Sequence, residues 1–419
     1  MRVLLVNTSE HTGGASVAAG RLLDALNGNG VKAKMLVTRK TSDRPTVAGL
    51  PAAWRYQASF YAERLAIWTA NGFRRDHLFD VDPAWTGVDI TRLPEFREAD
   101  VIHLHWINQG MLSLGGLRRI LRTGKPVVWT LHDMWPFTGV CHYARECKKW
   151  LTGCHHCELL LHGGGTHDMS ATTFRRKATT YAGARLSFVA CSHWLAGLAA
   201  ASPLTAGHDV ASIPNPICTR RFRPGDKTAL RRRLGLPVDR KLILFVAYKV
   251  TSPLKGVGYL CEALGRLAAS HPEVRDSWQL VAVGREADSL AGRVPVPVTA
   301  VDYVSTEAGM MDYYRAADVL AMPSLHDNLP NTIAEAMACG MPCVGFDVGG
   351  LPQMIDHRQN GYLAAYRDSE DFARGLLDTL HPVHYAERQA AARRKAEHTY
   401  SESAVAGAYI DVYEKLLNT

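Results

Sequence analysis

The chain has 419 residues, of which 47% are hydrophobic, and a formal net charge of +8. This length exceeds what one hydrophobic core usually supports, so we expect two to three domains with the composition of an ordinary soluble protein. No apolar run approaches the ~20 residues of a membrane helix, and the start, MRVLLVNTSEHTGG, lacks the pattern of a signal peptide. We therefore expect a cytoplasmic protein for which any contact with a membrane is peripheral.

The positive charge favours partners that carry phosphate or other negative groups, including an anionic membrane surface, without choosing among them. Basic residues are densest over 220–235, RRFRPGDKTALRRRLG, which is typical of a solvated loop and helix face. That stretch has neither interleaved aromatic residues nor a zinc-finger pattern, so it does not indicate nucleic acid as a partner.

Two segments have the pattern of the first buried strand of a parallel sheet, RVLLVN at 2–7 and KLILFVAY at 241–248. After the first, the pattern predicts a helix over 15–30 and strands over 32–37, 99–106, 126–133 and 186–192. After the second, it predicts helices over 258–269, 306–317 and 330–340, and strands over 278–284, 318–324 and 343–348. A last helix is predicted over 402–417.

Strands that alternate with helices in both halves predict an α/β protein with two doubly wound parallel sheets. The proline-rich stretch SIPNPICTRRFRP, 212–224, marks the boundary between them. We thus expect domains over 1–215 and 216–395, and a C-terminal helical segment over 396–419 that could cross back to the first domain. Ligands bind at the carboxyl ends of the strands in such sheets, so two facing domains would share a cleft.

The stretch HDNLPNTIAEAMACGMP, 326–342, places two carboxylates in a loop and a following helix. Pro330 suits the start of that helix and Gly340 its end, and the amides at the helix start form a natural site for phosphate. Two interpretations of the acidic residues are open. Asp327 and Glu335 could bind a ligand, or Asp327 could cap the helix while Glu335 is an exposed helical residue.

The wider stretch over 323–355 resembles the Glu-x7-Glu signature of glycosyltransferase family 4, with Asp327 in the first carboxylate position. The resemblance implies a GT-B fold and a nucleotide-diphosphate sugar as donor, with Glu335 on the ribose hydroxyls and Asp327 beside the donor sugar. A carboxylate suits two adjacent hydroxyls, because charge-assisted hydrogen bonds are roughly twice as strong as neutral ones. A proline replaces the glycine of many members, which leaves the amides of Leu329 and Asn331 as candidates for the diphosphate.

The strand end YKVTSPLKG carries Lys249 and Lys255 at the spacing of the family's Arg and Lys, which neutralise the leaving diphosphate. A fixed cation at that place accelerates the reaction as well as binding, because leaving-group charge builds in the transition state. Lys249 lacks the bidentate fork of an arginine and would be the weaker contributor. Without the rest of the match, two surface lysines would be the simpler interpretation.

In the first half, HTGGAS places Gly13 and Gly14 between a strand and a helix. This pair resembles the family's Gly-Gly-Ala loop, which approaches the donor phosphate and the acceptor. TLHD at a strand end matches a family His-Asp pair, which implies that His132 lines the reaction centre. His103 and His105 in HLHW suit a core position or the rim of the site equally well.

The segment over 129–157 contains four cysteines with the spacing C-x5-C-x6-C-x2-C, and three histidines. These residues are Cys141, Cys147, Cys154 and Cys157, with His142, His155 and His156. Four thiols in so short a stretch can close a tetrahedral structural zinc site, in which a histidine could replace one thiol. Free or reversibly paired thiols are the alternative, and four protein ligands would leave no open position for catalysis by the metal.

The same segment resembles a bacterial exopolysaccharide subgroup of the family, including enzymes for colanic-acid-type polymers. This implies a lipid-linked oligosaccharide acceptor, such as a polyprenyl-linked glycan, at the inner membrane face. The stretch over 54–75 has Trp54, Tyr61, Leu65 and Trp68 near one helical face among basic residues. Such a helix could lie on a membrane or shape a lipid-acceptor groove, although packing against the core is the commoner outcome of this pattern.

Together these features predict a glycosyltransferase that moves a sugar from a nucleotide-diphosphate sugar to a growing glycan, and the family resemblance implies retention at the anomeric carbon without an essential metal. Two alternatives remain. A sugar-nucleotide epimerase of the same architecture would form product without an acceptor. A catalytically degenerate binding module would bind a nucleotide sugar or a protein partner without turnover.

Overall fold

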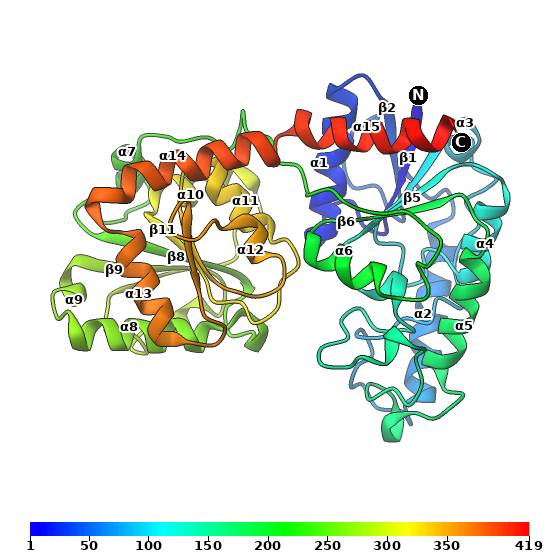
Figure 1. Cartoon of the computed structure of the whole chain (residues 1–419), viewed down its shortest axis with the longest axis horizontal. Helices are drawn as coiled ribbons and strands as arrows, with labels where there is room; N and C mark the ends of the chain where they lie inside the picture. The colour runs from blue at the N-terminus through cyan, green and yellow to red at the C-terminus, as the bar shows by residue number, and fades with distance from the viewer. Residues whose placement is uncertain (419) are drawn as a thin grey trace. The chain divides into compact units, whose positions relative to one another are not determined.

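The computed structural model describes residues 1–418, and the chain forms two compact units. Unit 1 consists of Met1–Pro216 together with the residues from Val405 onward, and unit 2 consists of Ile217–Ala404. Each unit contains one parallel sheet with helices on both of its faces (Figure 1). The prediction of two doubly wound parallel sheets is therefore confirmed.

The strands of unit 1 are β1 (Arg2–Val6), β2 (Lys32–Val37), β3 (Val47–Gly49), β4 (Val101–Leu104), β5 (Val127–Leu131), β6 (Leu186–Ala190) and β7 (Val210–Ser212). Its helices are α1 (Gly14–Gly28), α2 (Ala53–Ala70), α3 (Pro94–Glu98), α4 (Leu114–Arg122), α5 (Met169–Tyr181), α6 (His193–Ala200) and α15 (Glu402–Asn418). The sheet order is β3-β2-β1-β4-β5-β6-β7. Alternate strand residues face opposite sides, so Leu5 packs with α1 and α15 while Leu4 packs with α4 and α5.

The strands of unit 2 are β8 (Lys241–Lys249), β9 (Trp278–Arg285), β10 (Val298–Val301), β11 (Val319–Met322), β12 (Cys343–Phe346) and β13 (Gly361–Ala364). Its helices are α7 (Lys227–Arg233), α8 (Val257–Ser270), α9 (Val274–Ser277), α10 (Glu307–Ala316), α11 (Asn331–Ala338), α12 (Leu351–Met354), α13 (Ser369–Thr379) and α14 (Pro382–Thr399). The sheet order is β10-β9-β8-β11-β12-β13, which makes β8 and β11 central neighbours. Their carboxyl ends therefore lie side by side.

The sequence patterns missed the strands β3, β7, β10 and β13, which are the two edge strands of each sheet. Each has only three or four residues, and β7 and β10 are largely half-buried. An edge strand is covered on fewer sides than a central one, so it does not need the continuous apolar run by which the central strands were found.

The C-terminal helix α15 is part of unit 1 and packs on its sheet. The Tyr413 hydroxyl lies 2.6 Å from Nδ1 of His103, and the Tyr409 hydroxyl lies 2.8 Å from the hydroxyl of Thr130. His103 is fully buried, so of its two predicted roles the structure favours the core one. In the described part of the chain, no helix combines the length and apolar character needed to cross a membrane.

Three of the four residues predicted on one face of α2 do not pack into the core, against the commoner outcome of this pattern, and the fourth, Trp68, is half-buried. Trp54 and Tyr61 are 66% and 69% exposed, and Leu65 is also exposed. The fully or nearly buried side chains of this helix are instead Glu63, Arg64 and Ile67.

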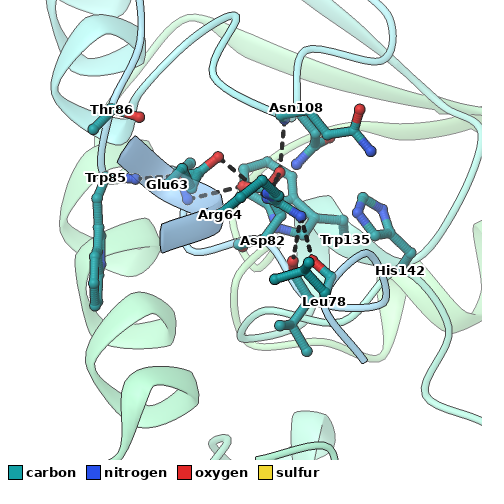
Figure 2. Close-up of polar contacts among 12 residues, drawn as sticks. Glu63, Arg64, Leu78, Asp82, Trp85, Thr86, Asn108, Trp135 and His142 are labelled. Atoms are coloured by element: carbon teal, nitrogen blue, oxygen red, sulfur yellow. Dashed lines mark hydrogen bonds and ion pairs between the residues drawn. The ribbon is translucent and has the colours of Figure 1, made fainter. Parts of the chain in front are cut away.

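The buried charges of α2 form a compact cluster with Asp82, shown in Figure 2. One guanidinium nitrogen of Arg64 lies 3.4 Å from a carboxylate oxygen of Glu63 and of Asp82, and the other donates to the carbonyl of Leu78 at 2.5 Å. The Glu63 carboxylate accepts the amide of Trp85 at 2.9 Å. The cluster thus joins α2 to the segment over 78–86.

The carboxyl groups of Glu63 and Asp82 share the guanidinium of Arg64 in this cluster, and all three side chains are buried. Burial, and then the neighbouring charge of Asp82, raise the pKa of Glu63 to about 8. A proton on Glu63 relieves the excess negative charge, because an unpaired buried charge is far more costly than a neutral carboxyl group.

We predict that Glu63→Gln makes the stability of the protein less dependent on pH, because an amide cannot ionise and still accepts from Trp85. The folded-state pKa lies above the ordinary value of 4.5, so the carboxyl contributes stability fully below that value and loses it as the pH rises towards about 8. From about pH 5 to about pH 8, the free energy of unfolding should fall more steeply in the wild type, by on the order of 1 kcal/mol per pH unit.

Urea denaturation at several pH values measures this difference. Glu98→Gln, at an exposed carboxylate of the same unit, is the control and should leave the wild-type profile unchanged. Parallel pH profiles for the wild type and Glu63→Gln would contradict the prediction.

Candidate active site

The strand ends β8 and β11 bring together two of the predicted site residues. Lys255 follows β8 and Asp327 follows β11, and the Lys255 ammonium lies 2.8 Å from a carboxylate oxygen of Asp327. Both side chains are partly buried. The two loops are also joined through their backbones, because the amide of Leu325 donates to the carbonyl of Leu254 at 2.9 Å.

Two glycines allow these loops to come so close. At Gly256 a Cβ atom would lie 1.9 Å from the carbonyl oxygen of Pro323, and at Gly349 it would lie 2.0 Å from that of Asp327. Both glycines have a positive φ, +66° and +61°, which other residues rarely adopt. The loop over 323–329 therefore fits between its neighbours only because two side chains are absent.

Helix α11 begins at Asn331, one residue after the predicted start, and Pro330 is in its N-cap position. Leu329 and Asn331 flank this proline, and no side chain caps the helix. Asp327 is therefore not the helix cap, which removes that alternative. The buried hydroxyls of Ser324 and Thr332, at the two ends of this segment, have no hydrogen-bond partner in the described part of the chain.

Glu335 lies one turn into α11 and is half-buried rather than an exposed helical residue. One of its carboxylate oxygens accepts the hydroxyl of Tyr314, on α10, at 2.6 Å. Sequence reasoning did not identify Tyr314, because no spacing along the chain relates the two residues.

Lys249, at the end of β8, forms an ion pair with Glu286 at 2.8 Å. Glu286 also accepts the hydroxyl of Thr251, and these partners lower the pKa of its carboxyl group. Its φ of +63° is uncommon for a residue with a side chain. Both members of the pair are about half exposed, so the interaction is screened by solvent and salt. Sequence analysis missed Glu286 as well.

In unit 1, the predicted glycine pair opens α1. Gly13 is the N-cap residue, with a φ of +89° and open space where a Cβ would be, and Gly14 is the first helical residue. The requirement for glycine at position 13 is thus conformational rather than steric.

His132 lies in a chain of polar side chains at the ends of β4, β5 and β6. Its Nε2 lies 3.0 Å from Nδ1 of His105, and its Nδ1 lies 3.6 Å from Sγ of Cys191. Sγ of Cys191 donates in turn to Asn215 at 3.1 Å. Burial lowers the pKa of His132 to about 4, against the opposing effect of Asp133, and lowers that of His105 as well.

Asp133, the neighbour of His132, is saturated with hydrogen bonds inside unit 1. Its carboxylate accepts from Nε1 of Trp106 and the amide of Trp135, both at 2.9 Å, and pairs with Nδ1 of His142 at 2.7 Å. Burial would lower the pKa of His142, but the charge of Asp133 and its hydrogen bond raise it. Asp133 therefore orders the loop after β5.

The predicted zinc site is not formed. In the described part of the chain, no three His, Cys, Asp or Glu side chains gather in a way that could hold a metal ion, and Cys141, Cys147, Cys154 and Cys157 are all free thiols. Burial raises the pKa of Cys141 to about 12 and that of Cys154 to about 11. His142 is engaged by Asp133.

The sequence matches two family descriptions, "Glycosyltransferase Family 4" over residues 12–221 and "Glycosyl transferases group 1" over residues 240–381. The D-inositol 3-phosphate glycosyltransferase of Thermobispora bispora is 32% identical over 331 residues, which cover 76% of this chain and 71% of that protein. The chain belongs to glycosyltransferase family 4.

Other curated relatives match over a shorter stretch. D-inositol 3-phosphate glycosyltransferase 2 of Catenulispora acidiphila is 35% identical over 223 residues, which cover 49% of this chain and 50% of the relative. This chain thus spans about half the length of the first curated relatives that it matches.

Solved structures share the fold of this family member. Sucrose-phosphate synthase from Thermosynechococcus elongatus has a TM-score of 0.66 at 18% identity, over 100% of this chain and 99% of that one. HepE of Anabaena, solved in complex with UDP, has a TM-score of 0.63 at 17% identity, over 99% of this chain and 100% of that one. The predicted GT-B fold class is confirmed by this likeness.

We predict that Glu286→Gln raises the affinity of the protein for inorganic pyrophosphate, because it removes the negative charge beside Lys249 and keeps an acceptor for Thr251. The gain should be about two- to fivefold at low salt and should shrink at about 0.5 M NaCl, since exposed charges are screened.

Isothermal titration calorimetry measures the effect. Glu262→Gln, which removes an exposed carboxylate paired with Arg266 in the same unit, is the matched control and should not change the affinity. Weaker binding by Glu286→Gln would mean that Glu286 instead holds Lys249 in its working position.

Proposed function

We propose that this protein is a retaining glycosyltransferase that transfers a sugar from a nucleotide-diphosphate sugar to a glycan acceptor. The observation that carries the proposal is the juxtaposition of the Lys255–Asp327 pair with the start of α11. A cation, a carboxylate and helix-start amides within one group of strand ends are what a diphosphate-linked sugar needs.

The donor would be held by groups of unit 2. Lys249 and Lys255 would neutralise the diphosphate, and the amides of Leu329 and Asn331 would bind its oxygens. Glu335 would accept the two ribose hydroxyls.

In the proposed reaction, the diphosphate leaves from the same face that the acceptor approaches, through an oxocarbenium-like state. The lysines stabilise the charge of the leaving group, and Asp327 contacts the sugar or the charge near its anomeric carbon. Gly13, Gly14 and His132 of unit 1 would serve the sugar and the acceptor.

For the acceptor we propose a lipid-linked oligosaccharide of bacterial exopolysaccharide synthesis, at the cytoplasmic face of the membrane. The likeness of residues 129–157 to that subgroup supports this, as do the exposed Trp54, Tyr61 and Leu65 of α2, since such residues suit a lipid surface. The curated relatives named above, which are D-inositol 3-phosphate glycosyltransferases, favour a second candidate, an inositol phosphate. An epimerase would be recognised by product formed without any acceptor.

We predict that one nucleoside diphosphate binds more tightly than the others. Glu335→Gln should weaken the binding of that nucleotide by about tenfold or more, because the side chain that accepts the two ribose hydroxyls loses its charge. Thermal-shift and calorimetric titrations with UDP, GDP, ADP and their sugars measure this, since a ligand of the folded state raises stability in proportion to ln(1 + [L]/Kd).

Glu387→Gln, an exposed carboxylate on α14 of the same unit, is the control and should bind as the wild type does. If no nucleotide binds, or if Glu335→Gln binds equally well, the proposal fails. A tight donor that is not turned over with any acceptor would favour the binding-module alternative.

A further inference from the structure

Tyr314 is a buried tyrosine whose hydroxyl meets the carboxylate proposed to bind ribose. The residue lies on α10 and is 1% exposed. Its hydroxyl donates to Oε2 of Glu335 at 2.6 Å, a length typical of a bond to a charged acceptor. Sequence analysis gave this residue no role.

The position of this hydroxyl is fixed by the packing of α10. Next to Tyr314, the guanidinium of Arg315 donates to the backbone carbonyls of Arg223 and Arg221, each at 2.7 Å. Just beyond the helix, the Asp318 carboxylate accepts the amide of Leu242 at 2.7 Å and so ties the start of β11 to β8. Tyr314 is therefore held at a rigid junction rather than on a mobile surface helix.

A glutamate that must accept two adjacent hydroxyls needs its carboxylate plane in one orientation. A free Glu side chain has several rotamers, and restricting them on binding costs free energy that a preorganised side chain does not lose. A carboxylate oxygen has two acceptor directions, so one oxygen can accept a ligand hydroxyl as well as the hydroxyl of Tyr314.

We propose that Tyr314 is a positioning residue for the donor, which orients Glu335 towards the two ribose hydroxyls. This inference rests on the proposed function. Tyr314 would act, through Glu335, only on the recognition of the vicinal diol of the ribose. It would have no role in binding the diphosphate or the base.

The expected effect follows from removing one hydroxyl. Tyr314→Phe should weaken the binding of the nucleoside diphosphate by about five- to tenfold, because Glu335 loses the hydroxyl that orients it but keeps its charge. Glu335→Gln should weaken it more. The double variant should bind no more weakly than Glu335→Gln alone, because residues that act through one another are not additive.

The experiment compares UDP, GDP and ADP with the 2′,3′-dideoxy forms of the same three nucleotides, by calorimetry on the full chain. Dideoxy ligands lack the hydroxyls that Glu335 would accept, so Tyr314→Phe should bind them as the wild type does. A purely structural defect would weaken the two classes of ligand alike. Tyr313→Phe, at the neighbouring half-buried position of the same helix, is the matched control. Circular dichroism confirms that each variant is folded.

The outcomes separate two failures. If no ribonucleotide binds the wild type, or if Glu335→Gln binds like the wild type, the proposed function fails and this inference falls with it. If Glu335→Gln weakens ribonucleotides but Tyr314→Phe does not, the inference alone fails. It fails equally if Tyr314→Phe weakens dideoxy and ribonucleotides to the same extent, or if the two substitutions are additive.

Discussion

The candidate site in unit 2 depends on the close passage of three loops, which two glycines make possible. The loop after β11 lies between the loop after β8, which it touches at Gly256, and the loop after β12, which it touches at Gly349. Lys255 immediately precedes Gly256, so the same close approach that excludes a side chain also brings the ammonium to Asp327. A β-carbon at either glycine would separate the loops and with them the two charges. The chemistry of the site is thus a consequence of backbone packing.

Each of the two lysines of this site is paired with a carboxylate, Lys255 with Asp327 and Lys249 with Glu286. Pairing keeps like charges at neighbouring strand ends from repelling one another. Lys249 and Glu286 are about half exposed, and ion pairs in such positions contribute little, so the proposed diphosphate ligand could replace Glu286 as the partner of Lys249 at small cost. A fully buried pair would hold its lysine too strongly for this exchange, because breaking it would leave an uncompensated charge. The partial exposure of these pairs therefore suits a site that must bind and release.

The local parts of this site could be read from the sequence, and the parts that cross between elements could not. The central strands β8 and β11 have continuous apolar runs, and Lys255, Asp327 and Glu335 follow at recognisable spacings. The contacts of Glu286 and Tyr314 join different elements, and only the tertiary packing decides that they meet. The cysteine spacing predicted a metal site, but the described residues contain no group of three side chains that could hold a metal ion. In α2 the aromatic pattern gave no sign that the buried side would be charged.

The histidines at the strand ends of unit 1 are largely buried, whereas the lysine–carboxylate pairs of unit 2 are partly exposed. His103, His105 and His132 form a stack at the strand ends, with ring centroids 4.3 Å and 5.3 Å apart, and burial lowers the pKa of each. Near neutral pH these rings are uncharged, and a base with a pKa of about 4 has little driving force to take a proton from a hydroxyl group. If His132 lines the reaction centre as proposed, it does so as a neutral hydrogen-bonding ring that orients a substrate. Removal of a proton from the acceptor must then fall to a group other than these histidines.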